Sequence, residues 1–500
     1  MDAPSIAPRN LKEPTYLDAI IPVVTLLVLV AGGAFLFGVA STDGPVQVAL
    51  LISCAVTALI VLKNGHPWKA ISKCGGAALA SVSAPFFILF SVGALIGTWN
   101  MSGTIPTMVY YGIKLLHPSY FYVASFVICV VISLGIGSSW TTAGTMGVGL
   151  VGLAAMVGVS PAITAGAVVS GSYVGDKLSP LSETTVLTAE LVEIDVFTHI
   201  RAMLWSSGPA CIIALVVFTI LSLREGGIAH NVDTASELTK LDQLFWITPL
   251  NLIPLILLVV LSVRKVAPAL AILSAALLAG VMAVILQPQA VVHVVSGPNL
   301  VPVVLPNVRA VWLVMANGYH MNSGIPEVDS LLSRGGMRSM LPTIWIIIGA
   351  VTFGTLLEEF KLLAKLIKPI VERAKTTGQL IAAVVATAIG LNIVAADQYI
   401  ALVLPARLYR TAFGERGLKP QNLSRACADA GTVTSPLVPW NSCGAFMSGT
   451  LGIPTMLYLP FCIFNIAAPI MSIVLGFTGF KIERIQPQIS TDRLAKRKCA

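Results

Sequence analysis

Long runs of apolar residues dominate the chain, and most of them are long enough to cross a lipid bilayer as a helix. A helix of about 20 residues spans the hydrocarbon core. The pattern therefore predicts an all-α polytopic membrane protein with about 10 crossings. The first run follows a polar stretch and is too long for the apolar core of a signal peptide, so we interpret it as the first crossing. The runs lie at residues 17–40, 46–62, 81–98, 119–137, 143–158, 161–190, 202–222, 246–263, 267–286, 343–357, 379–404, 425–452 and 460–480.

Three short motifs recur in the same order at a separation of 255 to 257 residues, which indicates two related halves. We count five crossings in each half, and an odd number inverts the second half relative to the first. Inverted repeats of this kind are typical of secondary transporters. The motif pairs are Gly97-Thr98 with Gly354-Thr355, Gly135 with Gly390, and Ser179-Pro180-Leu181 with Ser435-Pro436-Leu437.

The halves set the predicted domain organisation. We expect the first inverted repeat at 17–222 and the second at 246–480, joined by an external linker at 223–245. The polar ends, residues 1–16 and 481–500, are predicted to be cytoplasmic tails.

Positive charges fix the predicted sides of the membrane. We place the N-terminus in the cytoplasm and let the segments 119–158 and 379–404 return to the side that they entered, as re-entrant hairpins. Of the 31 Lys and Arg residues, 24 then fall in cytoplasmic segments, 6 fall outside, and Lys177 lies within the membrane. This asymmetry follows the positive-inside rule. The first hairpin could also be two full crossings, which would leave the sides unchanged.

Composition narrows the function classes. Hydrophobic residues make up 56% of the 500 residues and charged residues only 11%, against about 25% charged residues in soluble domains. The 8 cysteines form no CxxC motif, and the 6 histidines lack metal-ligand spacing. Phosphate-binding and nucleic-acid motifs are absent. We therefore expect neither a cofactor, nor ATP-driven pumping, nor a nucleic-acid partner.

Two helices are predicted to be broken at membrane depth, around Pro180 and around Pro436 and Pro439. Proline removes a backbone donor and clashes with the preceding turn of a helix. Backbone freed in this way is tolerated in a bilayer only if it is buried in protein or lines a cavity. Broken helices at matching places in two halves are the best sequence indication of a transport site.

Carboxylates near these breaks are the main candidates for binding and coupling. A charge at the centre of a bilayer costs on the order of 2.5–3.5 kcal/mol, so its default interpretation is functional. We rank Asp397 first because no cation is adjacent to it, and Asp176 second. The alternative for Asp176 is a local ion pair with Lys177, and the alternative for Glu183 is a cap on the helix that restarts. For Asp429, near the expected end of its helix, we favour a structural role.

Neutral oxygen ligands accompany the carboxylates, and unwound carbonyls with Ser, Thr or Asn oxygens suit Na⁺. Hydrogen bonding between neighbouring helices is the alternative for these side chains. The neutral candidates are Ser138, Ser139, Thr142, Ser179, Asn392, Thr434, Ser435 and Asn441. As Na⁺ ligands we select Asp397, Asp176, Ser179 and Ser435.

Over about residues 17–480 the sequence resembles the NhaC-type sodium/proton antiporters of the ion-transporter superfamily. The resemblance implies a bacterial inner-membrane protein with inverted repeats, two re-entrant hairpins and alternating access that exchanges Na⁺ for H⁺. The family also includes exchangers of small carboxylates, such as malate for lactate. At Glu183 the family more often has Asp. The motifs that carry the resemblance are Gly97-Thr98-Trp99 with Ser102 to Pro106, Gly171 to Ser182, Ala396 to Tyr399 with Leu404-Pro405, and Gly431 to Leu437 with Pro439-Trp440-Asn441.

The sequence thus predicts a secondary active transporter of the plasma membrane, and not an enzyme, in which one carboxylate binds Na⁺ and H⁺ in competition. The alternative is a Na⁺- or H⁺-coupled carrier of a small carboxylate or amino acid, whose anion Lys177, Arg407 or a half-helix N-terminus would hold. A membrane-embedded enzyme is disfavoured because no His lies in a broken segment. The expected partners are small ions, a small organic anion under the alternative, and the lipid bilayer; a homodimer stays open.

Overall fold

The structure is a computed structural model, and it describes residues 11–226, 242–295, 305–321, 329 and 332–485. These residues form helices and turns, with one isolated β-bridge between Leu418 and Arg484. Nine helices in the described part are long and apolar enough to cross a membrane. A bent pair, Thr455–Phe461 with Ile463–Thr478, makes a tenth if it counts as one span. The prediction of an all-α polytopic membrane protein is confirmed.

Helices of the first half occupy the predicted runs, and the broken run at 161–190 is two helices. Two further helices, at 68–81 and 104–115, lie between predicted crossings. A helix that continues to Gly226 enters the stretch predicted as an external linker, whose residues 227–241 lie outside the described part. The helices are α1 (Tyr16–Phe37), α2 (Pro45–Lys63), α3 (Trp68–Ser81), α4 (Ser83–Met101), α5 (Thr104–Leu115), α6 (Phe121–Ile136), α7 (Ser139–Thr142), α8 (Val148–Val157), α9 (Pro161–Leu178), α10 (Glu183–Leu191) and α11 (Val196–Gly226).

The second half contains helices that the search for apolar runs missed, because that search detects only crossings. Two of them, α15 and α16, lie in the stretch 287–342, between the predicted crossings at 267–286 and 343–357. The helices are α13 (Ile253–Val263), α14 (Pro268–Leu286), α15 (Pro288–Val295), α16 (Pro306–Asn317), α18 (Leu341–Glu359), α19 (Leu362–Arg373), α20 (Thr377–Val394), α21 (Gln398–Glu415), α22 (Pro420–Cys427), α23 (Ser442–Leu451), α24 (Thr455–Tyr458) and α25 (Ile463–Thr478).

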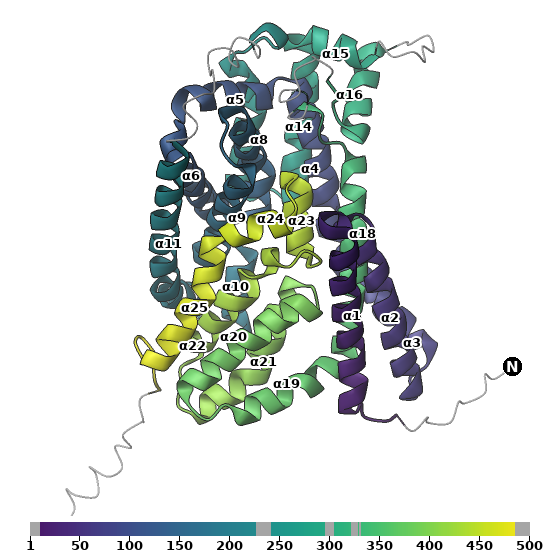
Figure 1. The fold of residues 1–500 in the computed structure, drawn as a ribbon, viewed down its shortest axis with the longest axis vertical. Coiled ribbons are helices and arrows are strands. Elements are labelled where there is room, and N and C mark those ends of the chain that lie inside the picture. Colours follow the sequence, from purple (N-terminus) through teal and green to yellow (C-terminus); the bar gives the residue numbers. More distant parts are fainter. Residues whose placement is uncertain (1–10, 227–241, 296–304, 322–328, 330–331, 486–500) are drawn as a thin grey trace, which may run out of the picture.

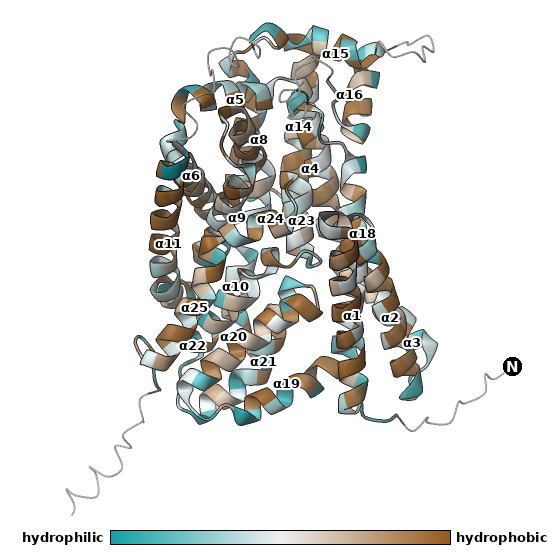
Figure 2. Ribbon diagram, viewed as in Figure 1, coloured by the Kyte–Doolittle hydropathy of each residue, from teal (hydrophilic) through white to brown (hydrophobic). Residues whose placement is uncertain are grey.

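The charge count predicts that 99–118 and 287–342 lie outside and that 63–80, 358–378 and 405–425 lie in the cytoplasm. Helices of these two groups lie at opposite ends of the molecule. In Figure 1, α5, α15 and α16 gather at the upper end, and α3, α19 and α22 lie toward the lower end. Between the ends, α1 and α11 present apolar surface, as Figure 2 shows, and large side chains such as Val28 and Ile212 are more than half exposed there. Such surface suits contact with lipid.

Two hairpins reverse the chain beside the two broken helices. In the first, α6 turns at Gly137 into α7, which a π-helix (Ala143–Gly147) joins to α8; in the second, α20 turns at Ala396 into α21. Both turn residues have a left-handed backbone, with φ of 76° and 55°. The first hairpin packs against α9, and α20 packs against the segment that follows α22. The fold therefore brings a hairpin tip to each break.

Glycines allow the closest of these approaches. A Cβ atom on Gly175 of α9 would lie 2.2 Å from the carbonyl oxygen of Ser133 on α6. A Cβ on Gly354 of α18 would lie 2.3 Å from the carbonyl oxygen of Ala395, at the tip of the second hairpin. A larger residue at either glycine would therefore clash with the backbone of the hairpin that packs there.

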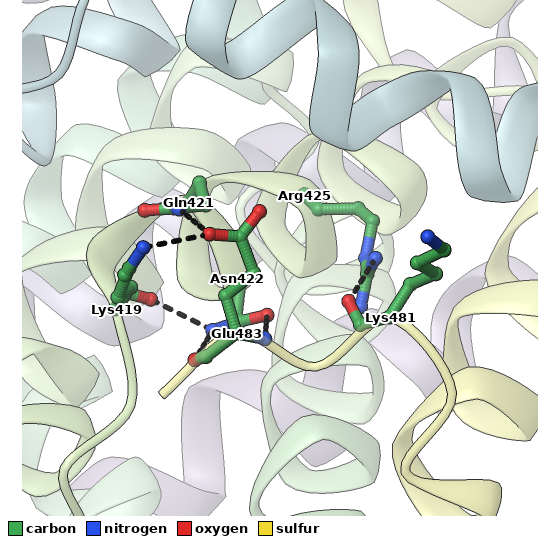
Figure 3. Close-up of polar contacts among 6 residues, drawn as sticks. All are labelled: Lys419, Gln421, Asn422, Arg425, Lys481 and Glu483. Atoms are coloured by element: carbon green, nitrogen blue, oxygen red, sulfur yellow. Dashed lines mark hydrogen bonds and ion pairs between the residues drawn. The ribbon is translucent and has the colours of Figure 1, made fainter. Parts of the chain in front are cut away.

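A C-terminal strap, defined here as residues 479–485, lies across the start of α22. Glu483 Oε2 accepts hydrogen bonds from Lys419 Nζ at 2.9 Å and from Gln421 Nε2 at 2.7 Å. The amides of Lys419 and Ile485 bond to carbonyls of Glu483 and Gly417. Figure 3 draws the side chains that join the strap to α22: Lys419, Gln421, Asn422, Arg425, Lys481 and Glu483.

We expect Glu483→Gln to loosen this strap. The hydrogen bond from Lys419 lowers the pKa of Glu483. Because the folded pKa is depressed, the contribution to stability is present above the ordinary Glu pKa of about 4.3 and is lost as the pH falls through the lowered value. Both side chains are about half exposed, and exposed pairs contribute about 0.2–1 kcal/mol. Amide exchange of Lys419 and Ile485, measured by mass spectrometry at pH 7, should accelerate about 1.4- to 5-fold.

The exposed Glu372 on α19 offers a matched control for this measurement. Glu372→Gln removes one carboxylate at the same end of the molecule and should leave these exchange rates unchanged. Equal rates in Glu483→Gln and the parent at pH 7 would show that the side chain does not hold the strap.

Candidate ion-binding site

The tip of the first hairpin holds the carboxylate of Asp176. Ser138 caps α7, its Oγ accepting the Thr141 N–H at 3.2 Å. The next residue, Ser139, donates its backbone N–H and its hydroxyl to the two oxygens of Asp176, at 2.9 and 2.5 Å. A helix N-terminus leaves its first N–H groups without partners inside the helix, so the hairpin tip can supply donors to the neighbouring break.

The break itself is satisfied by hydroxyl groups. The backbone carbonyl of Asp176 accepts hydrogen bonds from the side chains of Ser182, Thr184 and Thr185, at 3.3, 2.9 and 2.8 Å. Ser179 Oγ accepts the Leu181 N–H at 3.3 Å and so closes the turn around the proline. The side chains of α10 thus replace the helical donors that the sequence predicted would be lost here.

Asp176 is buried without a cation. The residue is 7% exposed, and its carboxylate accepts hydrogen bonds from two neutral donors, the backbone N–H and the hydroxyl group of Ser139. Within the described part of the chain it makes no ion pair. Burying a carboxylate without a counter-charge costs several kcal/mol. A bound cation or a proton would remove that cost.

Lys177 does not pair with Asp176, so the alternative of a local ion pair is wrong. Its ammonium group forms an ion pair with Asp429, and both side chains are completely buried. Asp429 Oδ1 also accepts a hydrogen bond from Ser206 of α11 at 3.0 Å. In the α-helix, adjacent side chains point about 100° apart, and the last turn of α9 stays helical, so Asp176 and Lys177 face different neighbours.

Asp429 has the structural role that the sequence favoured, but its partner Lys177 and its position were not predicted. It lies in a π-helix, Ala428–Thr432, between α22 and the second break, and not at a solvated helix end. A lysine at membrane depth requires a counter-charge, and that requirement was the signal available in the sequence. Arg425, one turn earlier, is also buried and donates to the carbonyl of Lys481 in the strap.

Asp397 is the N-cap of α21. Its Oδ1 accepts the backbone N–H groups of Tyr399 and Ile400 at 2.9 and 3.0 Å, and the residue is 7% exposed. No ion pair to Asp397 occurs among the described residues. Capping explains part of its presence at the hairpin tip, because Asp is a favoured N-cap residue.

Amide side chains brace the second break against its hairpin. Asn392 Nδ2 donates to the Gly431 carbonyl at 2.8 Å and to Thr434 Oγ1 at 3.0 Å. Asn441 caps α23 through the Cys443 N–H and donates to Asn392. Bonding between neighbouring elements, the alternative weighed for these candidates, therefore accounts for the contacts of Asn392, Asn441 and Thr434.

The two hairpins contact their breaks in a similar way. Each tip has a left-handed residue followed by an N-cap, and the residue after the N-cap reaches the break. Ser139 bonds to Asp176, and Gln398 Oε1 accepts a hydrogen bond from Ser435 Oγ at 3.0 Å. In the register of the Ser-Pro-Leu motifs, however, Ser435 corresponds to Ser179 and not to Asp176. The inverted repeat stays a prediction.

Aromatic side chains connect the regions of the two helix breaks. Trp140 of α7 stacks on Phe446 of α23, with ring centroids 4.0 Å apart and planes 14° apart. Tyr173 of α9 is completely buried, and its hydroxyl, which has no hydrogen bond of standard geometry, neighbours Cys443 and Ser435. The structure therefore places both breaks in one central region, although the sequence could only relate them by analogy.

The remaining candidates have local roles or lie apart. Thr142 donates its hydroxyl to the Ser138 carbonyl at 2.9 Å. Glu183 is exposed in the first turn of α10, whose N-cap is Ser182, so the capping alternative is wrong for the Glu183 position. Its carboxylate lies close to Tyr399 of α21. Ser435, Gln398, Tyr173 and Cys443 meet at the centre. Tyr173 and Gln398 lie in motifs that carry the family resemblance, but only Ser435 was selected as a binding residue from the sequence.

Comparison with known proteins places this architecture in context. The model of the Na+/H+ antiporter family matches residues 15–191 and 171–480. The Na(+)/H(+) antiporter NhaC of Alkalihalophilus pseudofirmus is 35% identical over 403 residues, which cover 80% of this chain and 83% of that protein. The Malate-2H(+)/Na(+)-lactate antiporter of Bacillus subtilis is 32% identical, covering 94% and 96%. The arginine/ornithine antiporter ArcD of Halobacterium salinarum is 31% identical, covering 97% and 96%.

A solved structure from a study of Neisseria gonorrhoeae MtrF aligns with 93% of this chain and 96% of its own, at a TM-score of 0.35 and 13% identity. The family match spans nearly all of the described helices, and it includes both hairpins and both breaks. The sequence relatives cover most of the chain at more than 30% identity. The chain therefore belongs to the Na+/H+ antiporter family.

Proposed function

We propose that this protein is a secondary active transporter of the bacterial inner membrane that exchanges Na⁺ for H⁺ by alternating access. Membership of the family and the two NhaC relatives support this assignment. The observation that carries it is the buried carboxylate of Asp176, whose contacts are all neutral. Na⁺ and H⁺ are the two species that can neutralise it, and they exclude each other. Their competition for one group couples the two fluxes.

We propose Asp176 as the first coupling residue and Asp397 as the second, which reverses the order inferred from the sequence. That order assumed that Lys177 stands beside Asp176, whereas Lys177 is neutralised by Asp429. Asp397 has in addition a structural role as the N-cap of α21. For the bound Na⁺ we propose the Asp176 carboxylate with Ser139 and Ser179, and Ser435 from the other break.

Two relatives support a second candidate. The malate/lactate and arginine/ornithine antiporters are 32% and 31% identical to this chain over 94% and 97% of its length. The alternative is therefore a Na⁺- or H⁺-coupled carrier of a small carboxylate or amino acid. Counterflow of radiolabelled malate, lactate or arginine in proteoliposomes, in the presence and absence of Na⁺, separates the two functions.

Asp176→Asn should abolish exchange. The amide keeps the volume of the side chain and its contacts with Ser139, but it has no negative charge that Na⁺ or a proton could neutralise. The measurement is proton movement into a pH dye inside proteoliposomes on which a Na⁺ gradient is imposed. Asp397→Asn should retain folding, since Asn is also a good N-cap, and should reduce the flux less. Glu372→Gln is the control with an unchanged flux. A wild-type flux in Asp176→Asn would transfer the coupling role elsewhere.

The Lys177–Asp429 pair should behave as a coupled unit in a double-mutant cycle. Lys177→Met or Asp429→Leu alone leaves one buried charge unpaired, at a cost of about 3–5 kcal/mol. The double substitution removes both charges and should be far less destabilising than the sum. Thermal unfolding in detergent measures the three variants. Additive losses would mean that the two groups do not stabilise each other.

Whole-cell labelling tests the proposed orientation, with both termini in the cytoplasm. Lys114→Cys at the end of α5 should react with an impermeant maleimide on intact cells. Lys368→Cys in α19 should react only after the membrane is permeabilised. Labelling of the α19 position on intact cells would invert the orientation.

A further inference from the structure

Two exposed arginines, Arg201 and Arg224, mark the ends of the apolar part of α11. The 22 residues between them, 202–223, contain no Asp, Glu, Lys or Arg. At 1.5 Å per residue they extend about 33 Å, close to the thickness of about 30 Å of a hydrocarbon core. Ile212 and Val216, on the face between the arginines, are more than half exposed. The helix therefore crosses the core with one arginine at each membrane boundary.

An aromatic pair and a lysine lie beside Arg201, where α11 packs against α25 (Figure 1). Trp205 follows Arg201 by four residues, so the two side chains are neighbours on one face of α11. The Trp205 ring meets Phe480 edge to face, with ring centroids 5.8 Å apart. Lys481 Nζ lies 4.3 Å from the centre of the Trp205 ring, which is a cation–π contact. These four exposed residues are called the boundary patch here: Arg201, Trp205, Phe480 and Lys481.

The C-terminal strap fixes the position of Lys481. The backbone of this residue has a φ of 54°, a left-handed value that is uncommon for a residue other than glycine. Its carbonyl accepts a hydrogen bond from Nη1 of the buried Arg425 at 3.2 Å. Figure 3 shows its ammonium group directed away from the Glu483 carboxylate. The fold thus holds the lysine against Trp205.

The boundary patch carries two positive charges. Among the described residues, neither Arg201 nor Lys481 forms an ion pair. The acidic residues nearest to them along the chain have other partners. Asp195 accepts a backbone hydrogen bond at the start of α11, and Glu483 binds Lys419. Two cations therefore meet at Trp205 without a paired carboxylate.

We propose that the boundary patch binds the headgroup of an anionic phospholipid. Arg201 and Lys481 pair with its phosphate group. Trp205 and Phe480 lie at the membrane–water interface, where aromatic side chains are enriched, and an acyl chain follows the apolar face of α11. An inorganic phosphate could use only the two cations, and a zwitterionic lipid lacks the net negative charge that attracts basic residues. The site is in the cytoplasmic leaflet of the proposed orientation, and it does not rest on Na⁺/H⁺ exchange.

Quenching of Trp205 fluorescence by brominated lipids tests the site in the full-length protein. The Trp205 signal is the fluorescence that a Trp205→Phe variant lacks. The protein is reconstituted into phosphatidylcholine vesicles that contain increasing fractions of phosphatidylglycerol or phosphatidylcholine with brominated acyl chains. The two quenching curves give the relative affinity of the site for the two lipids. We expect a preference of about 25-fold for phosphatidylglycerol, which is about fivefold for each basic residue near an anionic surface.

Substitution of the two cations should remove this preference. Arg201→Gln or Lys481→Gln alone should reduce it about fivefold, and the double variant should bind both lipids equally. Each variant keeps Trp205 and changes only an exposed side chain. Arg224→Gln is the matched control, because it removes the same charge from the same helix at the opposite membrane boundary. It should leave the preference of the Trp205 site unchanged.

Equal affinity for the two lipids in the unsubstituted protein would overturn the proposal, as would an undiminished preference in the double variant. Inorganic phosphate, compared with sodium chloride at the same ionic strength, should not reduce the preference. A loss of preference in phosphate would show that the site takes the free anion and not a lipid, and would also overturn the proposal. Trp205 fluorescence that neither brominated lipid quenches would mean that protein, such as a second copy of the chain, covers the patch, which contradicts a lipid site.

Discussion

The hydrocarbon core of a bilayer offers no hydrogen-bond partner to an interrupted helix, and the centre of this protein is organised by that constraint. Two helices are interrupted by Ser-Pro-Leu, and at each interruption side chains supply hydrogen bonds that the helix loses. At the first break, three hydroxyl groups of the following residues replace the missing donors to the Asp176 carbonyl. At the second break, Asn392 takes that role from the neighbouring hairpin.

The same constraint separates two kinds of buried charge. Lys177 and Asp429 neutralise each other across the two halves, with Ser206 as a further donor, so they join the halves at the cost of two buried charges. Asp176 and Asp397 have only neutral donors. Burying a carboxylate without a counter-charge costs free energy unless a mobile cation or a proton binds to it. In a transporter of cations, the transported ions can bind there. Geometry therefore divides the charges into a structural pair and candidates for transport.

The segment from α22 to α23 connects the functional regions. Its beginning is held by the C-terminal strap, its middle carries Asp429 and the second break, and its end lines a cavity of about 560 Å³. An element held at both ends and broken in the middle can change shape at the break while its ends remain seated. This arrangement suits alternating access, in which the site opens to one side at a time.

Sequence alone determined the class of fold, the spans and the places of both breaks, because apolar length and proline chemistry act locally and do not depend on distant residues. It also located the polar residues that gather at the breaks, from Ser138 and Ser139 to Ser435 and Asn441. The shorter helices α3, α5, α15 and α16 were not predicted, because a search for crossings ignores helices of 8 to 14 residues. Which charges pair was decided only by the tertiary structure. Lys177 is next to Asp176 in the chain, yet the direction of a helical side chain sends it to Asp429, 252 residues away. The contact among Tyr173, Gln398 and Cys443 was also decided by the tertiary structure. The packing of two distant segments against each other cannot be inferred from the residues that neighbour either segment in the sequence.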